Sequence, residues 1–211
     1  MTAKSRRAPA GAALLQDDVT GAITAAFFRE WARVGYAALS IEAVAKRAGV
    51  GKAAVYRRWS SKLAMASELL LEVGVGMARA PDTGSLEGDV RAFLDAAYSV
   101  LRHPLVRRIL PDLHAEMRRS APLARAIRTS LQVERRAMGE ALLRRAIDRG
   151  ELSASIDVDL ALDLLGGLLY WRLIITGMDT PPRYLVDLKA LTLGALRSMS
   201  AEANGYVTGR G

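Results

Sequence analysis

The sequence predicts an all-α protein, and three observations carry that prediction. Half of its 211 residues (51%) are hydrophobic, which is enough to bury a core, so a disordered chain is not expected. Ala, Leu, Arg and Glu dominate the long stretches between turn residues, and these residues favour helices. Apolar residues there recur at three- and four-residue steps, as on a helix with one buried face. The placing of Gly and Pro stops predicts about nine helices.

The N-terminal residues 1–16 are expected to form a basic, disordered arm. Lys4, Arg6 and Arg7 precede the weakly apolar segment Ala8–Leu15, as in a secretory signal peptide, but acidic residues from Asp17 onward interrupt it too early. The absence of Cys excludes a disulfide framework, a thiolate metal site and a cysteine nucleophile. We therefore expect a cytoplasmic protein.

A first domain is expected over residues 17–62, and its first helix runs from Asp17 or Asp18 to Val34. Acidic residues favour the start of that helix, and Gly35 follows as a stop. Four apolar residues at four-residue steps predict one buried stripe: Val19, Ile23, Phe27 and Trp31.

Two short helices follow and predict a helix-turn-helix. Ser40 caps a helix over Ile41–Ala48, Gly49 ends it, and a third helix follows over Lys52–Trp59 after a tight turn. A close helix crossing needs a small residue, a turn residue that tolerates positive φ, and apolar residues between the helices. The residues that meet these needs are Ala45, Gly49, Val44, Val50 and Val55, with Ile41 and Trp59 at the ends.

The other face of the third helix has the residue types that contact DNA. Lys52, Ala53, Tyr56 and Arg57 share the face opposite Val55 and Trp59. A short Ala lets the backbone approach bases, and Lys or Arg can donate to guanine or to phosphate. We expect Ser40, Tyr56, Arg58 and Lys62 to hold phosphates. An ordinary solvated Arg pair, or a half-buried Tyr56, remains the alternative for each residue taken singly.

The net charge of +8 is concentrated in this part of the chain. Residues 1–62 contain 11 Lys and Arg against 4 Asp and Glu, and residues 63–211 contain 19 against 18. A basic module on a near-neutral body is typical of a DNA-binding head, because phosphate neutralisation contributes much of the affinity. A merely basic surface explains the charge equally well.

The stretch Phe27–Lys62 resembles the DNA-binding domain of the tetracycline-repressor-like (TetR) family. Its sequence is FFREWARVGYAALSIEAVAKRAGVGKAAVYRRWSSK, in which the family's GY, ALS, AGV and final SK recur in order. The resemblance covers about 45 residues from Asp17, and beyond Lys62 it extends only to the helical plan. It implies a homodimeric regulator that binds double-stranded DNA.

Three positions depart from the family pattern. Gly51 stands where the family has Ser or Thr before the Lys, so any contact from Gly51 must come from its backbone. Ala53 replaces a usual Gly, and Arg57 and Arg58 stand where a His often follows the Tyr. The added positive charge predicts a steeper salt dependence of DNA binding.

A second helical domain is expected over residues 63–200, with a frayed tail over 201–211. Ser60 or Ser61 caps a linking helix that reaches about Arg79, and Pro81–Ser85 is a linker. Prolines fall at the boundaries of the later helices. Those helices are expected at Leu86–Arg102, Leu105–Arg119, Pro122–Arg149, Asp157–Thr176 and Pro182–Met199.

The helices near 157–176 and 182–199 are predicted to form a dimer interface. The first has one apolar stripe through Leu160, Leu164, Leu168, Trp171 and Ile175, and another through Ala161, Leu165, Leu169 and Leu173. A helix that is apolar on two faces is buried on both, and Gly166 and Gly167 allow close approach. The last helix offers Leu185, Leu188, Thr192, Ala195 and Met199. Completion of a monomer core is the alternative.

A small-molecule effector site is expected in the second domain. The candidates mix apolar bulk with a few polar groups: Phe93, Tyr98, His114, Met117, Gln132 and Trp171. Arg172 needs a partner if buried, and Glu116 is a candidate, either as a structural pair or as a ligand anchor.

The predicted function is a ligand-responsive regulator, a repressor released from a palindromic operator by a small molecule. A constitutive or protein-controlled DNA-binding protein is the alternative. An enzyme is not expected, because His103 and His114 lie among ordinary helix residues, without a nucleophile elbow or a phosphate-binding Gly loop. No cofactor, metal or catalytic residue is predicted, and the charges of Asp163 and Arg172 argue against a membrane span at Leu160–Met178.

Overall fold

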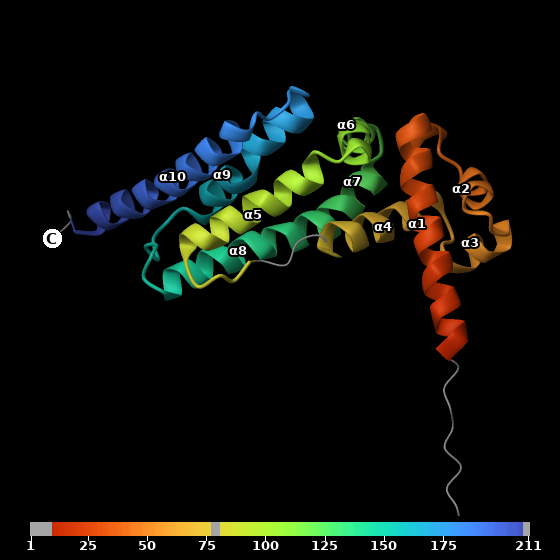
Figure 1. Cartoon of the computed structure of the whole chain (residues 1–211), viewed down its shortest axis with the longest axis horizontal. Helices are drawn as coiled ribbons and strands as arrows, with labels where there is room; N and C mark the ends of the chain where they lie inside the picture. The colour runs from red at the N-terminus through yellow and green to blue at the C-terminus, as the bar shows by residue number, and fades with distance from the viewer. Residues whose placement is uncertain (1–9, 77–80, 209–211) are drawn as a thin grey trace, which may run out of the picture. The chain divides into compact units, whose positions relative to one another are not determined.

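The computed structural model describes the backbone of residues 10–76 and 81–208 and the side chains of residues 19–73 and 81–201. Over these residues it consists of helices and the turns between them, as the sequence predicts (Figure 1). The chain divides into two compact units, Met1–Leu69 (unit 1) and Leu70–Gly211 (unit 2). None of the helices over the described ranges has the length and apolarity that crossing a membrane requires.

Unit 1 is built from three helices and the start of a fourth. These are α1 (Ala10–Ala38), α2 (Ile41–Ala48), α3 (Lys52–Arg58) and α4 (Lys62–Gly76), and α4 continues into unit 2. Ser61 caps α4, because its hydroxyl accepts a hydrogen bond from the Ala64 amide at 3.1 Å. The expected end of this helix near Arg79 lies outside the described residues.

Unit 2 contains the remaining helices and two π-helical turns, η1 and η2. They are α5 (Leu86–Leu101), α6 (Pro104–Arg119), α7 (Ala121–Ile127), η1 (Arg128–Gln132), α8 (Val133–Asp148), α9 (Val158–Tyr170), η2 (Trp171–Ile175) and α10 (Pro182–Thr208). Because η1 joins α7 to α8 and η2 extends α9, the described residues form 9 continuous helices. Residues 81–85 are non-helical, as predicted for the linker.

Helix α1 is the support of unit 1. Ile23, Phe27 and Trp31 are at most 4% exposed and form the predicted buried stripe, whereas Val19 is 41% exposed, so the prediction was wrong for Val19. Gly35 adopts φ 77°, which ends the regular helix where the sequence predicts a stop.

Two predicted chain ends are more helical than expected. Residues 10–16 belong to α1, so the predicted disorder of the 1–16 arm was wrong there, while residues 1–9 lie outside the described part. The tail predicted to fray after Ala201 continues α10 to Thr208. In both segments Ala favours the helix, and no Pro interrupts it.

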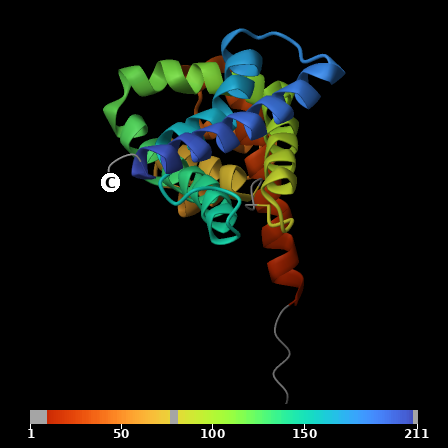
Figure 2. The same ribbon diagram turned by 90° about the vertical axis from the view of Figure 1, so that its left-hand side faces the viewer.

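Helix α5 is the centre of unit 2. It contacts α8, α9 and α10, and α10 also contacts α9, which it crosses in Figure 2. Leu86, Val90 and Leu94 of α5 are at most 1% exposed and pack in one core with Leu142, Leu165 and Leu196 of the surrounding helices. Helix α6 and the α7–η1 segment lie beside this core and enclose a pocket described below.

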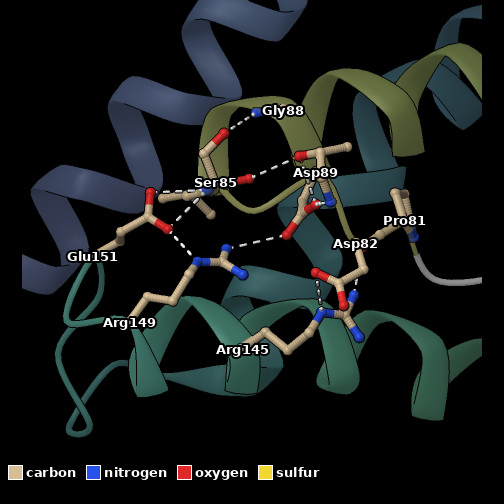
Figure 3. Close-up of polar contacts among 10 residues, drawn as sticks. Pro81, Asp82, Ser85, Gly88, Asp89, Arg145, Arg149 and Glu151 are labelled. Carbon is tan, nitrogen blue, oxygen red and sulfur yellow. Dashed lines mark hydrogen bonds and ion pairs between the residues drawn. The ribbon is translucent and has the colours of Figure 1, made fainter.

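A buried carboxylate holds the start of α5 (Figure 3). Asp89 is fully buried; its Oδ1 accepts hydrogen bonds from the amide and hydroxyl of Thr83 at 2.6 and 2.9 Å. Its Oδ2 accepts one from Arg149 of the turn after α8 at 3.1 Å. The Glu151 carboxylate accepts a hydrogen bond from the Leu86 amide at 2.8 Å and forms an ion pair with Arg149 at 2.6 Å. This cluster joins the linker, α5 and the end of α8.

The electrostatics of Asp89 favour its ionised form. Burial alone would raise the pKa of the Asp89 carboxyl, but the hydrogen bonds from Thr83 and Arg149 outweigh burial and lower it. A lowered folded-state pKa stabilises the fold above the pKa of an unfolded Asp, about 3.9. That stabilisation is lost as the pH falls through the folded-state pKa.

The substitution Asp89→Asn is expected to lower the free energy of unfolding by about 2–3 kcal/mol at pH 7, because charge-assisted hydrogen bonds to a buried group are lost. The difference from the unsubstituted protein should shrink as the pH falls below about 4. Denaturant titration across pH measures both effects. The matched control is Asp82→Asn, because Asp82 is 66% exposed and lies 3.7 Å from Arg145. An equal loss in both variants, or a pH-independent loss, would contradict this account.

Candidate functional site

The turn between α2 and α3 has the geometry that the sequence predicts for a helix-turn-helix. The Ser40 hydroxyl accepts a hydrogen bond from the Ala43 amide at 3.1 Å and so caps α2. Gly49 adopts a left-handed φ of 69°, which an L-residue rarely takes. The Val50 amide then donates to the Ala45 carbonyl at 3.0 Å, so the chain turns sharply into α3.

One side of this motif is packing surface. Val44 and Val55 are fully buried, Ala45 is 2% exposed at the contact between α2 and α3, and Val50 is half-buried. Ile41 and Trp59 close the two ends, at 6% and 1% exposure. The predicted packing set is therefore confirmed, with Val50 its least buried member.

The other side of α3 is open to solvent. Gly51, Lys52, Ala53, Tyr56 and Arg57 are all exposed and share one face. Gly51 is the N-cap of α3 and supplies no side-chain cap, which is the consequence expected from the missing hydroxyl. The face joins two exposed cations, an aromatic ring and a short side chain.

Glu42 contacts this face, and the sequence analysis did not single it out. Its Oε1 lies 2.6 Å from the Lys52 ammonium and accepts a hydrogen bond from the Tyr56 hydroxyl at 3.1 Å. The hydrogen bond between them raises the pKa of Lys52 and lowers that of Glu42. In the sequence Glu42 has only the pattern of an acid at a helix start, which is common and has a structural explanation. The acid therefore holds two of the candidate contact residues of α3, Lys52 and Tyr56.

Arg58 and Lys62, predicted phosphate contacts, make internal contacts in unit 1. Arg58 pairs with Glu68 at 3.0 Å and donates to the Thr20 hydroxyl at 2.7 Å, while its guanidinium lies over Trp59. The Lys62 ammonium donates to the carbonyls of Tyr36 and Ala37 at 2.7 and 3.1 Å. Lys62 thereby satisfies carbonyl groups at the end of α1, which have no partner within the helix.

A buried acid fixes α2 on α1. Glu30, 2% exposed, pairs with Arg33 at 2.5 Å and with Arg47 of α2 at 2.7 Å. The hydrogen bond from Arg33 lowers the pKa of Glu30, burial opposes that effect, and Arg47 lowers the pKa further. The ionised acid thus joins α1 to α2, the first helix of the helix-turn-helix.

Unit 2 contains a cavity of about 350 Å³ between α6, α7–η1, α8 and α9. Its apolar lining includes Leu110, Leu113, Met117, Ile127, Leu131 and Leu162. Its polar lining comes from His114, Gln132, Arg135, Asp163 and Tyr170, and two glycines of α9 complete the wall. The volume lies at the lower end of the range of roughly 300–1,000 Å³ that organic ligands use.

Three of the predicted effector residues line this cavity: His114, Met117 and Gln132. Phe93 and Tyr98 pack against the core of unit 2, and Trp171 is 59% exposed. Arg135, Asp163 and Tyr170 also line the cavity, and nothing in their spacing distinguishes them from the other polar residues of the same helices.

The candidate pair of Glu116 and Arg172 does not form. Glu116 pairs with Arg119 one turn away at 3.0 Å. Arg172 donates to the Asp179 carbonyl at 2.8 Å and lies over the ring of Tyr184. Each residue therefore has a structural role within unit 2, but with a partner other than the predicted one.

The two faces of α9–η2 differ as the stripes predict, except at Leu164, which is half-buried and packs against the core. Ala161, Leu165, Leu169 and Leu173 are at most 2% exposed and belong to the core. Leu160, Leu168, Trp171 and Ile175 are 40–59% exposed, and α10 adds Val186 at 62% and Leu191 at 58%. The residues predicted on α10 face the other way, since Leu188 and Thr192 are buried. This exposed apolar surface of α9–η2 and α10 is called the α9–α10 face below.

Two family profiles match the chain, one for each unit. The profile described as "Bacterial regulatory proteins, tetR family" matches residues 23–69. The profile described as "Tetracyclin repressor-like, C-terminal domain" matches residues 80–192, which is more than half of the chain.

Individual relatives agree with both matches. The HTH-type transcriptional regulator YdeS of Bacillus subtilis is 30% identical over 169 residues, 79% of this chain and 84% of YdeS. The DNA-binding transcriptional repressor TetR of Mycobacteroides abscessus is 32% identical over 69% of this chain and 76% of the relative. The crystal structure of the TetR family transcription regulator SCO0332 is 30% identical and superimposes with a TM-score of 0.66, covering 84% of this chain and 97% of SCO0332.

The contacts of Lys62 predict a structural effect of its removal. Lys62→Met should lower the free energy of unfolding by about 1–2 kcal/mol, because two carbonyls lose a charged donor. Thermal and denaturant unfolding of the full chain measure it. Lys46→Met is the matched control, since Lys46 is exposed on α2. If both variants have the same free energy of unfolding as the unsubstituted protein, the carbonyl contacts contribute nothing to stability.

Proposed function

Because the chain belongs to the tetR family of bacterial regulatory proteins and is a DNA-binding transcriptional regulator, we propose that it is a repressor released from a palindromic operator by a small molecule. The observation that carries the DNA-binding part is the exposed face of α3 with Lys52, Ala53, Tyr56 and Arg57. Repression is supported by the relative from Mycobacteroides abscessus, which is a DNA-binding transcriptional repressor.

In this proposal α3 enters the major groove. Ala53 lets the helix approach the base edges, and Lys52 and Arg57 donate to guanine or to phosphate. The Ser40 end of α2, Gly51 through its backbone, Tyr56 and Arg58 hold phosphates at the flanks. A phosphate contact by Lys62 would require its ammonium to leave the carbonyls of α1.

The α9–α10 face supports a homodimer. The face exposes six large apolar side chains by 40–62%, and monomeric proteins rarely expose so much apolar surface. A second copy would cover these side chains in a two-fold four-helix bundle. Two copies place two α3 helices against two half-sites, and a palindromic operator follows from that symmetry.

The cavity in unit 2 supports control by a small molecule. It mixes apolar walls with a few polar groups, which is the usual make-up of an effector site. Helix α4 belongs to both units, so a ligand that shifts its unit 2 end would alter the spacing of the two α3 helices. Dimeric operators demand a fixed spacing, and a small change suffices to weaken binding.

The test of the DNA-binding face begins with an operator selected from bound genomic fragments. Lys52→Ala should weaken binding of that operator about tenfold or more, because a specific base contact contributes about 1–3 kcal/mol. Anisotropy titration at several salt concentrations measures affinity and salt slope. Arg118→Ala is the control, because Arg118 is an exposed cation on α6 in unit 2. Equal affinities of the two variants would remove Lys52 from the interface.

Glu42→Gln should change DNA affinity in the opposite direction. The substitution removes a negative charge 2.6 Å from Lys52 and adjacent to the approaching phosphates. Binding to unrelated DNA should strengthen about threefold or more at low salt, and the gain should shrink at high salt through screening. Weaker binding to all DNA would mean that Glu42 serves to position Lys52 and Tyr56.

Release by a small molecule is tested with the full chain on its operator and a chemically diverse library. A true effector raises the melting temperature by mass action and lowers operator affinity in the same concentration range. A library in which no compound does both would favour the constitutive or protein-controlled regulator over the proposed one.

A further inference from the structure

The cavity in unit 2 has one strong charge that the protein leaves without an acidic partner. Arg135 lines the wall and makes no hydrogen bond or ion pair among the described residues, whereas the adjacent Arg136 pairs with both Glu140 and Asp159. Two neighbouring arginines of α8 thus differ completely in their surroundings. Arg136 forms its ion pairs at the surface, whereas Arg135 lines the cavity.

The surroundings of Arg135 oppose its charge. The residue is reachable from solvent, yet burial of its guanidinium by the cavity wall lowers its pKa, which Tyr170 only partly offsets. A cation that is desolvated without a partner is unfavourable, and a bound anion relieves that cost. Arginine also presents a planar pair of donors that matches a carboxylate.

Two of the other polar groups of the lining, His114 and Tyr170, are neutral. His114 and Tyr170 share a hydrogen bond, with their rings edge-to-face at 5.8 Å. Burial lowers the pKa of His114, so this imidazole is uncharged at neutral pH, and burial raises the pKa of Tyr170. The pair forms a polar edge that can orient a ligand but adds no second positive charge.

Asp163 is the acid of the cavity lining, and it raises the alternative of a cationic ligand. The side chain is exposed, so water already solvates its charge and it gains less from a partner. Arg135 is exposed as well, but the cavity wall desolvates its guanidinium enough to lower its pKa, so Arg135 gains more from a partner. The balance therefore favours an anion, bound with its charge at Arg135 and away from Asp163.

Two adjacent glycines of α9 keep space for such a ligand. A Cβ at Gly166 or Gly167 would meet no atom within 4 Å, so packing within the described chain does not require glycine at either position. A glycine inside a helix is unfavourable relative to alanine. Both glycines line the cavity, and the volume they leave open is available to an occupant.

We infer that this cavity binds an organic carboxylate with a compact apolar body, held by Arg135 at its charged end and by the leucine-rich wall along its length. The inference rests on the proposed release by a small molecule and names the chemistry of that molecule. It predicts that charge, in addition to shape, decides which compounds the regulator accepts.

The experiment compares acids with amides of the same shape by calorimetry on the full chain. The probes are 1-naphthoate, octanoate and decanoate, each beside its primary amide. At least one acid should bind about tenfold or more tightly than its amide, because a charge-assisted bidentate contact is lost in the amide. If no acid binds, or if every amide binds as tightly as its acid, the inference is overturned.

Variants locate the charge. Arg135→Met should remove the preference for the acid while leaving the affinity of the amide within about twofold, since the apolar stem is kept. The matched control is Arg128→Met in η1, an exposed arginine outside the cavity lining, which should retain the preference. Asp163→Asn should strengthen acid binding about twofold, because a like charge is removed. A preference that survives in Arg135→Met, or acid binding that weakens in Asp163→Asn, would overturn the assignment.

Gly166→Ala locates the apolar body. The added methyl group meets no protein atom within 4 Å and favours the helix, so the variant should fold at least as stably as the original chain. It should weaken acid and amide alike about threefold or more, because it fills the cavity. Unchanged affinity for both would place the ligand elsewhere.

Operator anisotropy in the same samples separates this inference from the proposed function. If neutral compounds release the operator and no carboxylate binds, the regulator is ligand-responsive and the inference fails. If carboxylates bind through Arg135 and never change operator affinity, the cavity assignment stands and the proposed release fails.

Discussion

The organisation of unit 2 depends on one helix, α9, that is apolar around most of its circumference. Ala161, Leu165 and Leu169 are buried in the core, while Leu160 and Leu168 remain open to solvent. Positions between these two stripes carry Asp163, Gly166, Gly167 and Tyr170, which line the cavity. The helix therefore has a core face, an open apolar face and a cavity face. A ligand in the cavity and a second copy on the α9–α10 face would contact the same rigid element.

The π-helical turns belong to the same arrangement. Residues Leu131 and Gln132 of η1 line the cavity, and Tyr170 lines it immediately before η2. A π-turn inserts one residue into a helix, shifts the side chains that follow to another face, and is frequent at functional sites. In η1 this shift comes directly before Arg135, the residue of α8 that lines the cavity. The irregular turns thus coincide with the part of the fold that packing alone does not explain.

Periodicity and turn chemistry in the sequence were sufficient for the helices, the turn at Gly49 and the two stripes of α9, because each depends on residues close together in the chain. They were insufficient wherever a partner comes from elsewhere. Lys62 has the pattern of a helix-start cation, and only the fold brings the Tyr36 carbonyl to 2.7 Å from it. Arg135 and Arg136 are equivalent in the sequence, but one faces the cavity and the other faces Asp159. Val19 belongs to a perfect four-residue repeat but is exposed, because the buried stripe of α1 begins only at Ile23.

The contacts of Lys62 also bear on how a displacement could reach the exposed face of α3. Its ammonium holds the carbonyls at the end of α1, so the first turn of α4 is fixed to α1, and Glu30 in turn fixes α1 to α2 through Arg47. Arg58 adds a link from the end of α3 to Glu68 of α4. Three charged contacts thus join all four helical segments of unit 1. A shift of this end of α4 would move α3 together with the rest of the unit, because bending within it would first have to break these contacts, some of them partly buried.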